Sequence, residues 1–102
     1  MKFIGGIRQG KSFWRSMNAT WPFARLTVAP EGLTLGTTFF WTFSFERNQI
    51  TKLSKYGFVP FFATGLRIEH SVAGYPPFIV FWTFWFGGVK AALIENGYVV
   101  SD

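Results

Sequence analysis

The chain has one histidine and five acidic residues, and no pattern brings them to a common reacting centre. His70 follows Glu69 directly, and neighbouring residues of a strand face opposite sides of a sheet, so these two cannot act as a pair. General acid–base catalysis needs such groups within hydrogen-bond reach of one reacting atom. The sequence therefore predicts no catalytic residues, and we expect His70 to lie at the margin of the core.

Metal and nucleotide sites also lack their usual residues. The absence of cysteine excludes disulfides, zinc–thiolate sites and cysteine nucleophiles. The acidic residues and His70 stand at unrelated spacings, which do not suit a metal site. Gly5-Gly6 and Gly87-Gly88 are not followed by the Lys-Ser/Thr of a phosphate-binding loop. We expect neither metal nor cofactor, and predict a protein that is not an enzyme.

Cations stand beside aromatic residues near the amino terminus, at Lys11, Trp14 and Arg15 and again at Arg25. Tryptophan favours the headgroup level of a membrane, and each Lys or Arg near an anionic leaflet contributes about 1 kcal/mol. The combination also suits single-stranded nucleic acid, through stacking and phosphate contacts. A third interpretation is an arm whose rings enter the core while its cations stay in water. We rank nucleic acid behind the other two.

A second candidate surface is the aromatic segment between Tyr56 and Thr64, which contains a proline. Loops usually run over the surface, and exposed apolar side chains there usually mark an interface. The alternative is a loop that folds inward and closes the end of a barrel. The apolar candidates for contact with a partner are Phe58, Val59, Phe61 and Phe62.

Composition and charge point to one domain with a basic amino-terminal part. A length of 102 residues suits a single domain, and aromatic residues make up 22% against 15% charged. Residues 1–25 hold five basic residues and no acid, whereas residues 26–102 hold five of each. The net charge of +5 therefore belongs to the first quarter of the chain.

The longest uncharged stretch is too short for a membrane span once its prolines are considered. Ser71–Val89 is divided by Pro76-Pro77, and a spanning helix needs about 20 apolar residues. The amino-terminal residues contain no apolar run of the length that a secretory signal needs. We expect a cytoplasmic protein or one peripheral to the inner membrane, with a small integral membrane protein as an alternative.

From residue 25 the sequence alternates as strands do, and it ends in an amphipathic helix. Pro30-Glu31-Gly32 predicts a hairpin turn, and Asn96-Gly97 predicts a helix end. We expect a basic, aromatic amino-terminal arm over residues 1–20 and one β domain over residues 21–102. Within this domain we expect a helix over 86–97 and strands near 25–28, 33–35, 39–46, 50–56, 66–72 and 78–85.

The last expected strand, 78–85, is apolar on both faces. An antiparallel strand with one solvent-exposed face normally alternates apolar and polar residues. Either the fold covers its second face or that face meets a partner. A self-associating protein that dimerises through this strand is therefore an alternative function.

Four runs followed by a closing strand and helix resemble bacterial pleckstrin-homology-like (PH-like or GRAM-like) domains. The runs are 22–28, 31–33, 43–50 and 65–70, and the resemblance covers roughly residues 21 to 99. It implies a mainly β fold, a split antiparallel β-barrel of six to seven strands capped by one C-terminal α-helix. Phosphoinositide-binding members hold the headgroup with basic residues of the first hairpin, whose turn here is short and acidic.

The resemblance and the lack of catalytic groups predict a non-catalytic binding or scaffolding module. Its expected partner is an anionic membrane surface or another protein, and homo-oligomers are an open alternative.

Overall fold

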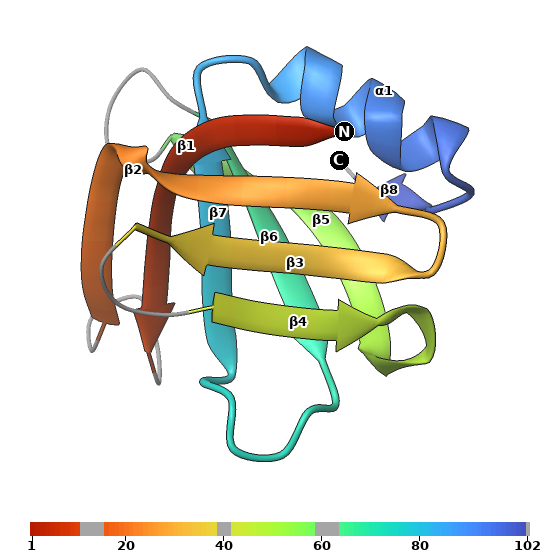
Figure 1. The fold of residues 1–102 in the computed structure, drawn as a ribbon, viewed down its shortest axis with the longest axis horizontal. Coiled ribbons are helices and arrows are strands. Elements are labelled where there is room, and N and C mark those ends of the chain that lie inside the picture. Colours follow the sequence, from red (N-terminus) through yellow and green to blue (C-terminus); the bar gives the residue numbers. More distant parts are fainter. Residues whose placement is uncertain (11–15, 39–41, 59–63, 102) are drawn as a thin grey trace.

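An open β-sheet and one α-helix make up the part of the chain that the structure describes (Figure 1). This computed structural model describes residues 1–10, 16–38, 42–58 and 64–101, with only the backbone for 16–21 and 58. The elements are β1 (Lys2–Gly10), β2 (Ser16–Ala29), β3 (Gly32–Thr37), β4 (Thr42–Glu46), a 3-10 turn (Arg47–Gln49), β5 (Ile50–Phe58), β6 (Thr64–His70), β7 (Phe78–Thr83), α1 (Phe86–Glu95) and β8 (Val100–Ser101). The expected mainly β class with one helix is confirmed.

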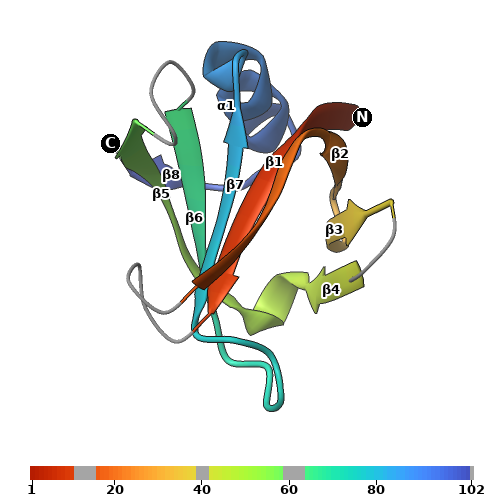
Figure 2. The same cartoon turned by 90° about the vertical axis from the view of Figure 1, so that its left-hand side faces the viewer.

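Eight described strands follow the order β4-β3-β2-β1-β7-β6-β5-β8. All neighbours are antiparallel except β5 and β8, which run parallel. The sheet curls strongly, so that β3 and β4 lie across from β5 and β6, and α1 lies over one end (Figures 1 and 2). The strand count exceeds the expected six to seven because β1 and β8 also belong to the sheet.

The amino-terminal segment is not a separate arm in its first half. Residues 2–10 form β1, which lies between β2 and β7 in the middle of the sheet. Phe3 and Ile7 are buried in the main core, at 4% and 0% exposure. This basic stretch joins the sheet because its apolar side chains enter the core, while the adjacent cations Lys2 and Arg8 lie on the other face.

Strand β1 bends at Gly5 and Gly6 and so contributes to both halves of the curled sheet. Gly5 pairs with Ala24, and the register with β2 then shifts before Ile7. A Cβ atom on Gly5 would overlap the carbonyl oxygen of Trp82 and lie 2.9 Å from the Phe81 ring. Only glycine therefore permits this approach of β1 to β7.

Strand β7 is buried on both faces. Ile79 and Phe81 belong to the main core, while Phe78, Val80 and Trp82 point to the outer face of the sheet. All five are at most 5% exposed. The chain itself covers the second face of this strand, which leaves the expected dimer surface without exposed side chains over residues 78–83.

Tyr56 on β5 and Arg67 on β6 cover part of that outer face. The ring centroids of Tyr56 and Phe78 lie 5.5 Å apart, nearly perpendicular, and Tyr56 also packs against Trp82. The Arg67 guanidinium lies 5.5 Å from the centre of the Phe78 ring. Long side chains on β5 and β6 thus exclude water from an outward-facing aromatic row.

The β2–β3 turn forms where the sequence predicts it, and α1 ends slightly earlier than expected. Pro30 and Glu31 make a two-residue connection between Ala29 and Gly32. Helix α1 ends at Glu95 rather than at the expected residue 97, because Gly97 adopts a left-handed conformation with φ +86°. The Gly97 amide donates to the Ile94 carbonyl and the Tyr98 amide donates to the Leu93 carbonyl, as in a Schellman motif.

The free edge of β4 is protected by two side chains. The Ser44 amide donates to the Tyr75 hydroxyl at 3.1 Å, and the Glu46 amide donates to Oε1 of Gln49 at 2.9 Å. Tyr75 also packs edge-on against Phe45. The β6–β7 connection therefore fills the open end of the sheet, opposite α1, and shields an edge strand from added strands.

Replacement of Gly5 by alanine should destabilise the protein. The added methyl group meets a backbone carbonyl that cannot move alone, and such overpacking costs about 1–3 kcal/mol. Gly36→Ala is the matched control, since its Cβ would meet only Thr42 at 3.5 Å, an ordinary contact. Urea unfolding measures both, and equal effects of the two substitutions would contradict the assigned role of Gly5.

Candidate interaction surface

Most of the residues proposed from the sequence as contact residues lie outside the described part of the chain. Those are Lys11, Trp14, Arg15, Val59, Phe61 and Phe62. Phe58 ends β5, and its side chain is not described. Arg25 is exposed on β2, so it is the one member of the set whose side chain can be placed on the surface.

The two candidate segments leave the sheet at opposite ends of β7. Gly10, the last described residue before Lys11, pairs with Phe78, whereas Thr64, at the end of the other segment, pairs with Thr83. Five residue steps along a strand correspond to roughly 17 Å. The sheet therefore does not bring the points of attachment together, and one continuous surface built from both segments is not supported by this topology.

Arg25 lies toward the Thr83 end of β7. It pairs with Ile4 across β1 and β2, and the Thr83 hydroxyl donates to the Ile4 carbonyl at 3.4 Å. At the same end, Thr64 at the start of β6 pairs both with Thr83 on β7 and with Phe58 on β5. Arg25, the described member of the proposed cations, therefore lies toward the end of β7 at which Thr64 pairs.

Four exposed apolar side chains gather at this end of the sheet, and we call them the apolar patch. Ile4, Phe23, Phe84 and Trp85 are 52%, 46%, 60% and 64% exposed. Ile4 and Phe23 lie diagonally across β1 and β2 on the outer face, and Phe84 follows Thr83. The patch thus joins two adjacent strands to the segment that enters α1.

Trp85 is held in place although most of its ring is exposed. Its ring centroid lies 5.8 Å from that of Phe3, which belongs to the core. A Cβ atom on Gly88 would overlap the indole, so glycine lets the ring lie against the first turn of α1. A ring positioned in this way presents a large apolar surface with little loss of conformational freedom on binding.

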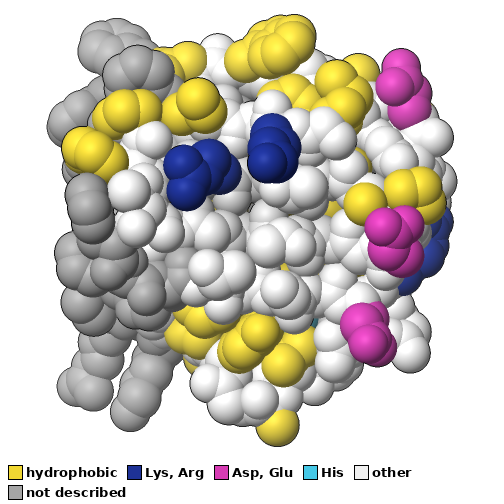
Figure 3. Space-filling model, in the orientation of Figure 1, with side chains coloured by type: hydrophobic (Ala, Val, Ile, Leu, Met, Phe, Trp, Pro, Cys, Tyr) yellow, Lys and Arg dark blue, Asp and Glu magenta, His cyan; other side chains and the backbone are white. Residues whose placement is uncertain are grey.

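Two cations border the apolar patch, and the described acidic residues lie elsewhere. Lys2 and Arg25 are exposed on the outer face beside Ile4. The described acids stand in the β2–β3 turn and at the ends of β4, β6 and α1, as Glu31, Glu46, Glu69 and Glu95. Figure 3 shows basic side chains next to hydrophobic ones on one side of this face and acidic side chains along the other margin.

Strand alternation contains the signal for part of this patch. Phe23 shares a face with Arg25, and Ile4 shares a face with Lys2, so both stand on the polar side of their strands. A large apolar residue on a wet face is the departure from alternation that marks it. The expected arm over residues 1–20 concealed this pattern, because no strand was assigned there.

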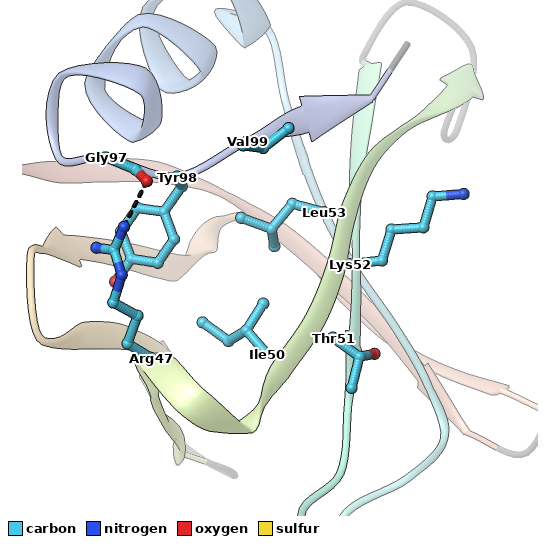
Figure 4. A pocket seen from close by; sticks show the side chains of 8 residues that line it. All are labelled: Arg47, Ile50, Thr51, Lys52, Leu53, Gly97, Tyr98 and Val99. Carbon is cyan, nitrogen blue, oxygen red and sulfur yellow. Dashed lines mark hydrogen bonds between the residues drawn. The ribbon is translucent and has the colours of Figure 1, made fainter.

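A cleft between β5 and the residues before β8 is the other hollow of interest (Figure 4). Its volume is about 200 Å³, and Ile50, Leu53 and Tyr98 point into it while Lys52 points away. Arg47 closes one end. The cleft exists because β8 pairs with β5 only at Leu53 and Ser54, so the two segments diverge beyond them.

Arg47 in that cleft has a structural role. Its guanidinium donates to the carbonyl oxygens of Pro30 and Asn96, at 2.8 and 2.9 Å, and to that of Gly97. It also lies 4.4 Å from the centre of the Tyr98 ring. A cation at the carboxyl end of a helix opposes the negative end of its dipole, so Arg47 stabilises α1 and ties it to the β2–β3 turn.

His70 has both ring nitrogens in backbone hydrogen bonds. Nδ1 accepts from the Val72 amide at 3.0 Å, so Nε2 carries the proton that it donates to the Pro76 carbonyl at 2.8 Å. Its ring packs against Phe45. His70 therefore shapes the β6–β7 connection, and among the described residues no group of three or more His, Asp or Glu side chains could hold a metal ion.

The described helix is too short to cross a membrane. Helix α1 has 10 residues, and no helix in the described ranges is both long and apolar enough to span a bilayer.

The Tyr98→Phe variant should change how stability depends on pH. Burial raises the pKa of the Tyr98 hydroxyl above its usual 10.0; nearby Arg47 opposes this and Glu31 adds to it. As pH rises, the unfolded chain loses this proton first, so the stabilisation is complete below pH 10 and is lost as pH passes through the folded pKa. Wild-type free energy of unfolding should therefore fall more steeply above pH 10 than that of the variant.

The variant should also be less stable at neutral pH, by about 0.5–1.5 kcal/mol, because the hydroxyl donates to the Ala29 carbonyl at 2.7 Å. Urea unfolding at pH 7 and above pH 10 measures both effects. Parallel curves for the two proteins across this range would contradict the burial of the hydroxyl.

No protein-family model, curated protein or solved structure matches this chain. Its function is therefore inferred from the chemistry of its own surface.

Proposed function

We propose that this protein is a non-catalytic binding module that attaches peripherally to an anionic membrane through the apolar patch. The observation that carries the proposal is the grouping of four exposed apolar side chains beside Lys2 and Arg25. Scattered exposed apolar residues are ordinary, but a contiguous set bordered by cations is typical of an interaction surface. Tryptophan and phenylalanine next to Lys and Arg suit the boundary between headgroups and acyl chains.

A PH-like architecture is part of this proposal. Its support is a strongly curled antiparallel sheet with a C-terminal helix over one end, together with the sequence runs that resemble PH-like domains. The β2–β3 turn contains Glu31 and no basic residue. Binding through the outer face of β1 and β2 and the start of α1 therefore does not involve the acidic β2–β3 turn.

The free energy of burying the apolar patch is not enough by itself to guarantee measurable membrane binding. Four half-exposed side chains of this size would bury on the order of 400 Å², worth roughly 10 kcal/mol at about 25 cal/mol per Å². Lost translational and rotational freedom costs about 4–15 kcal/mol. Two cations that contribute about 1 kcal/mol each on an anionic leaflet can thus decide whether binding is measurable. We expect binding that requires anionic lipid and weakens with salt.

Vesicle sedimentation tests the proposal. Wild-type protein should sediment with phosphatidylcholine vesicles that contain phosphatidylserine, at low salt, and not with phosphatidylcholine alone. Phe84→Ser should lower the partition coefficient about tenfold or more, because burial of a large apolar side chain is worth about 1.5–3 kcal/mol. Val99→Ser is the matched control: Val99 is 83% exposed but outside the apolar patch, so binding should be unchanged.

Two results would contradict the proposal: no sedimentation of the wild type at low salt, or equal losses in the Phe84 and Val99 variants. A protein partner or a second copy of the chain is the rival occupant of the same patch. Light scattering over a concentration series detects self-association, and a dimer that Phe84→Ser dissociates would favour this rival.

A further inference from the structure

We infer that Lys2 and Arg25 together form a seat for the phosphate group of an anionic phospholipid, at the border of the apolar patch. This inference rests on the proposed membrane attachment and adds a specific headgroup contact to it. The seat lies on the outer face of β1 and β2, which the sheet register defines.

The register places the two cations close together. Arg25 pairs with Ile4, and Lys2 pairs with Thr27, so Lys2 and Arg25 are diagonal neighbours on adjacent strands. Such neighbours lie roughly 7–8 Å apart, within reach of long side chains. A phosphate between them could accept from the Lys2 ammonium and from two N–H groups of the Arg25 guanidinium.

Nothing among the described residues neutralises this pair. Both side chains are exposed, and neither makes an ion pair with a described acidic residue. Like charges on adjacent strands repel, so the free protein carries an unfavourable interaction that a shared anion would convert into a favourable one. The pair is thus better explained by a bound anion than by the stability of the sheet.

The neighbouring side chains on this face are hydrogen-bond donors rather than carboxylates. Thr27 pairs with Thr34 on β3, and Gly36 stands opposite Arg25. Both threonines are partly exposed, and their hydroxyl groups can donate to phosphate or glycerol oxygens. Along this face apolar residues are followed by cations and then by hydroxyl groups. This order matches the acyl chains, the phosphate groups and the polar outer layer of a bilayer.

The position of the apolar patch favours a lipid over a soluble anion or a nucleic acid. Ile4 pairs with Arg25, and its carbonyl accepts from the hydroxyl of Thr83, which precedes Phe84, so an anion in the seat would hold its attached group next to exposed apolar side chains. Acyl chains profit from that contact, whereas a free phosphate or a polynucleotide backbone does not.

A double-mutant cycle on vesicles tests the seat. The full chain and its Lys2→Gln, Arg25→Gln and doubly substituted variants are titrated with phosphatidylcholine vesicles containing phosphatidate, whose phosphate is unobstructed, and with charge-matched phosphatidylserine vesicles. Lys55→Gln removes an equal charge from an exposed position on β5 and is the matched control. All three substituted positions are exposed, and circular dichroism verifies the folding of each variant.

Each single substitution in the seat should weaken phosphatidate binding about tenfold, and the double substitution should weaken it about tenfold to twentyfold rather than a hundredfold. The effects of substituting two residues that hold the same group are not additive. Lys55→Gln should have less than a twofold effect, and the losses should be smaller on phosphatidylserine.

Additive losses, or losses matched by Lys55→Gln, would overturn the seat while leaving membrane attachment intact, since the wild type would still bind. Absence of wild-type binding to either vesicle would overturn both proposals. Saturation of the seat by millimolar inorganic phosphate alone, seen as amide shifts at residues 2, 25 and 27, would reassign it to a soluble ligand. Displacement from vesicles by a single-stranded oligonucleotide, lost in Arg25→Gln, would reassign it to nucleic acid.

Discussion

The close approach of β1 to β7 at Gly5 is the constraint on which the rest of the structure depends. Because no side chain stands there, β1 can pair with β2 on both sides of the register shift at Gly6, while its second half, from Gly6 to Gly10, also pairs with β7. The curl encloses the core without closing the sheet. It also sets the outer face, since the residues that precede the bend, Lys2 and Ile4, are turned outward beside Arg25. The close packing at Gly5 thus determines which side chains of β1 lie on the outer face.

The two ends of the curled sheet are completed by different means. At one end α1 buries Val89, Ala92 and Leu93, and Arg47 holds its final carbonyl groups against the β2–β3 turn. At the other end Tyr75 enters the space beside Phe45 and satisfies an amide of the edge strand β4. Both contacts join segments far apart in sequence, and the helix contributes no side-chain cap at its own amino end. The helix therefore depends on tertiary contacts in addition to the local Gly97 motif at its carboxyl end.

Local signals predicted the local structure well and the long-range structure poorly. Alternation around Leu26, Leu35, Phe43 and Phe45 gave buried and exposed faces that the structure has, and the Gly97 helix end was predicted from two residues. The amino-terminal strand was missed because Gly5-Gly6 interrupts its alternation, and Gly5 is explained only by its approach to β7, which follows more than 70 residues later. Arg47 could not be assigned from sequence for the same reason: its partners are carbonyl groups, which carry no sequence signal.

The total number of aromatic residues says less about a binding surface than their position on a strand does. Twenty-two per cent of the chain is aromatic, yet Phe43, Phe45, Phe78, Phe81 and Trp82 are all enclosed. A small curled sheet needs large rings, since few residues must fill the space between its halves. What the interior does not require is an aromatic or aliphatic side chain on a face that otherwise carries cations and hydroxyl groups. Phe23 and Ile4 are in that position, and about half of each side chain is exposed, at 46% and 52%. An outward apolar residue next to an uncompensated cation is thus the more specific sign of a partner.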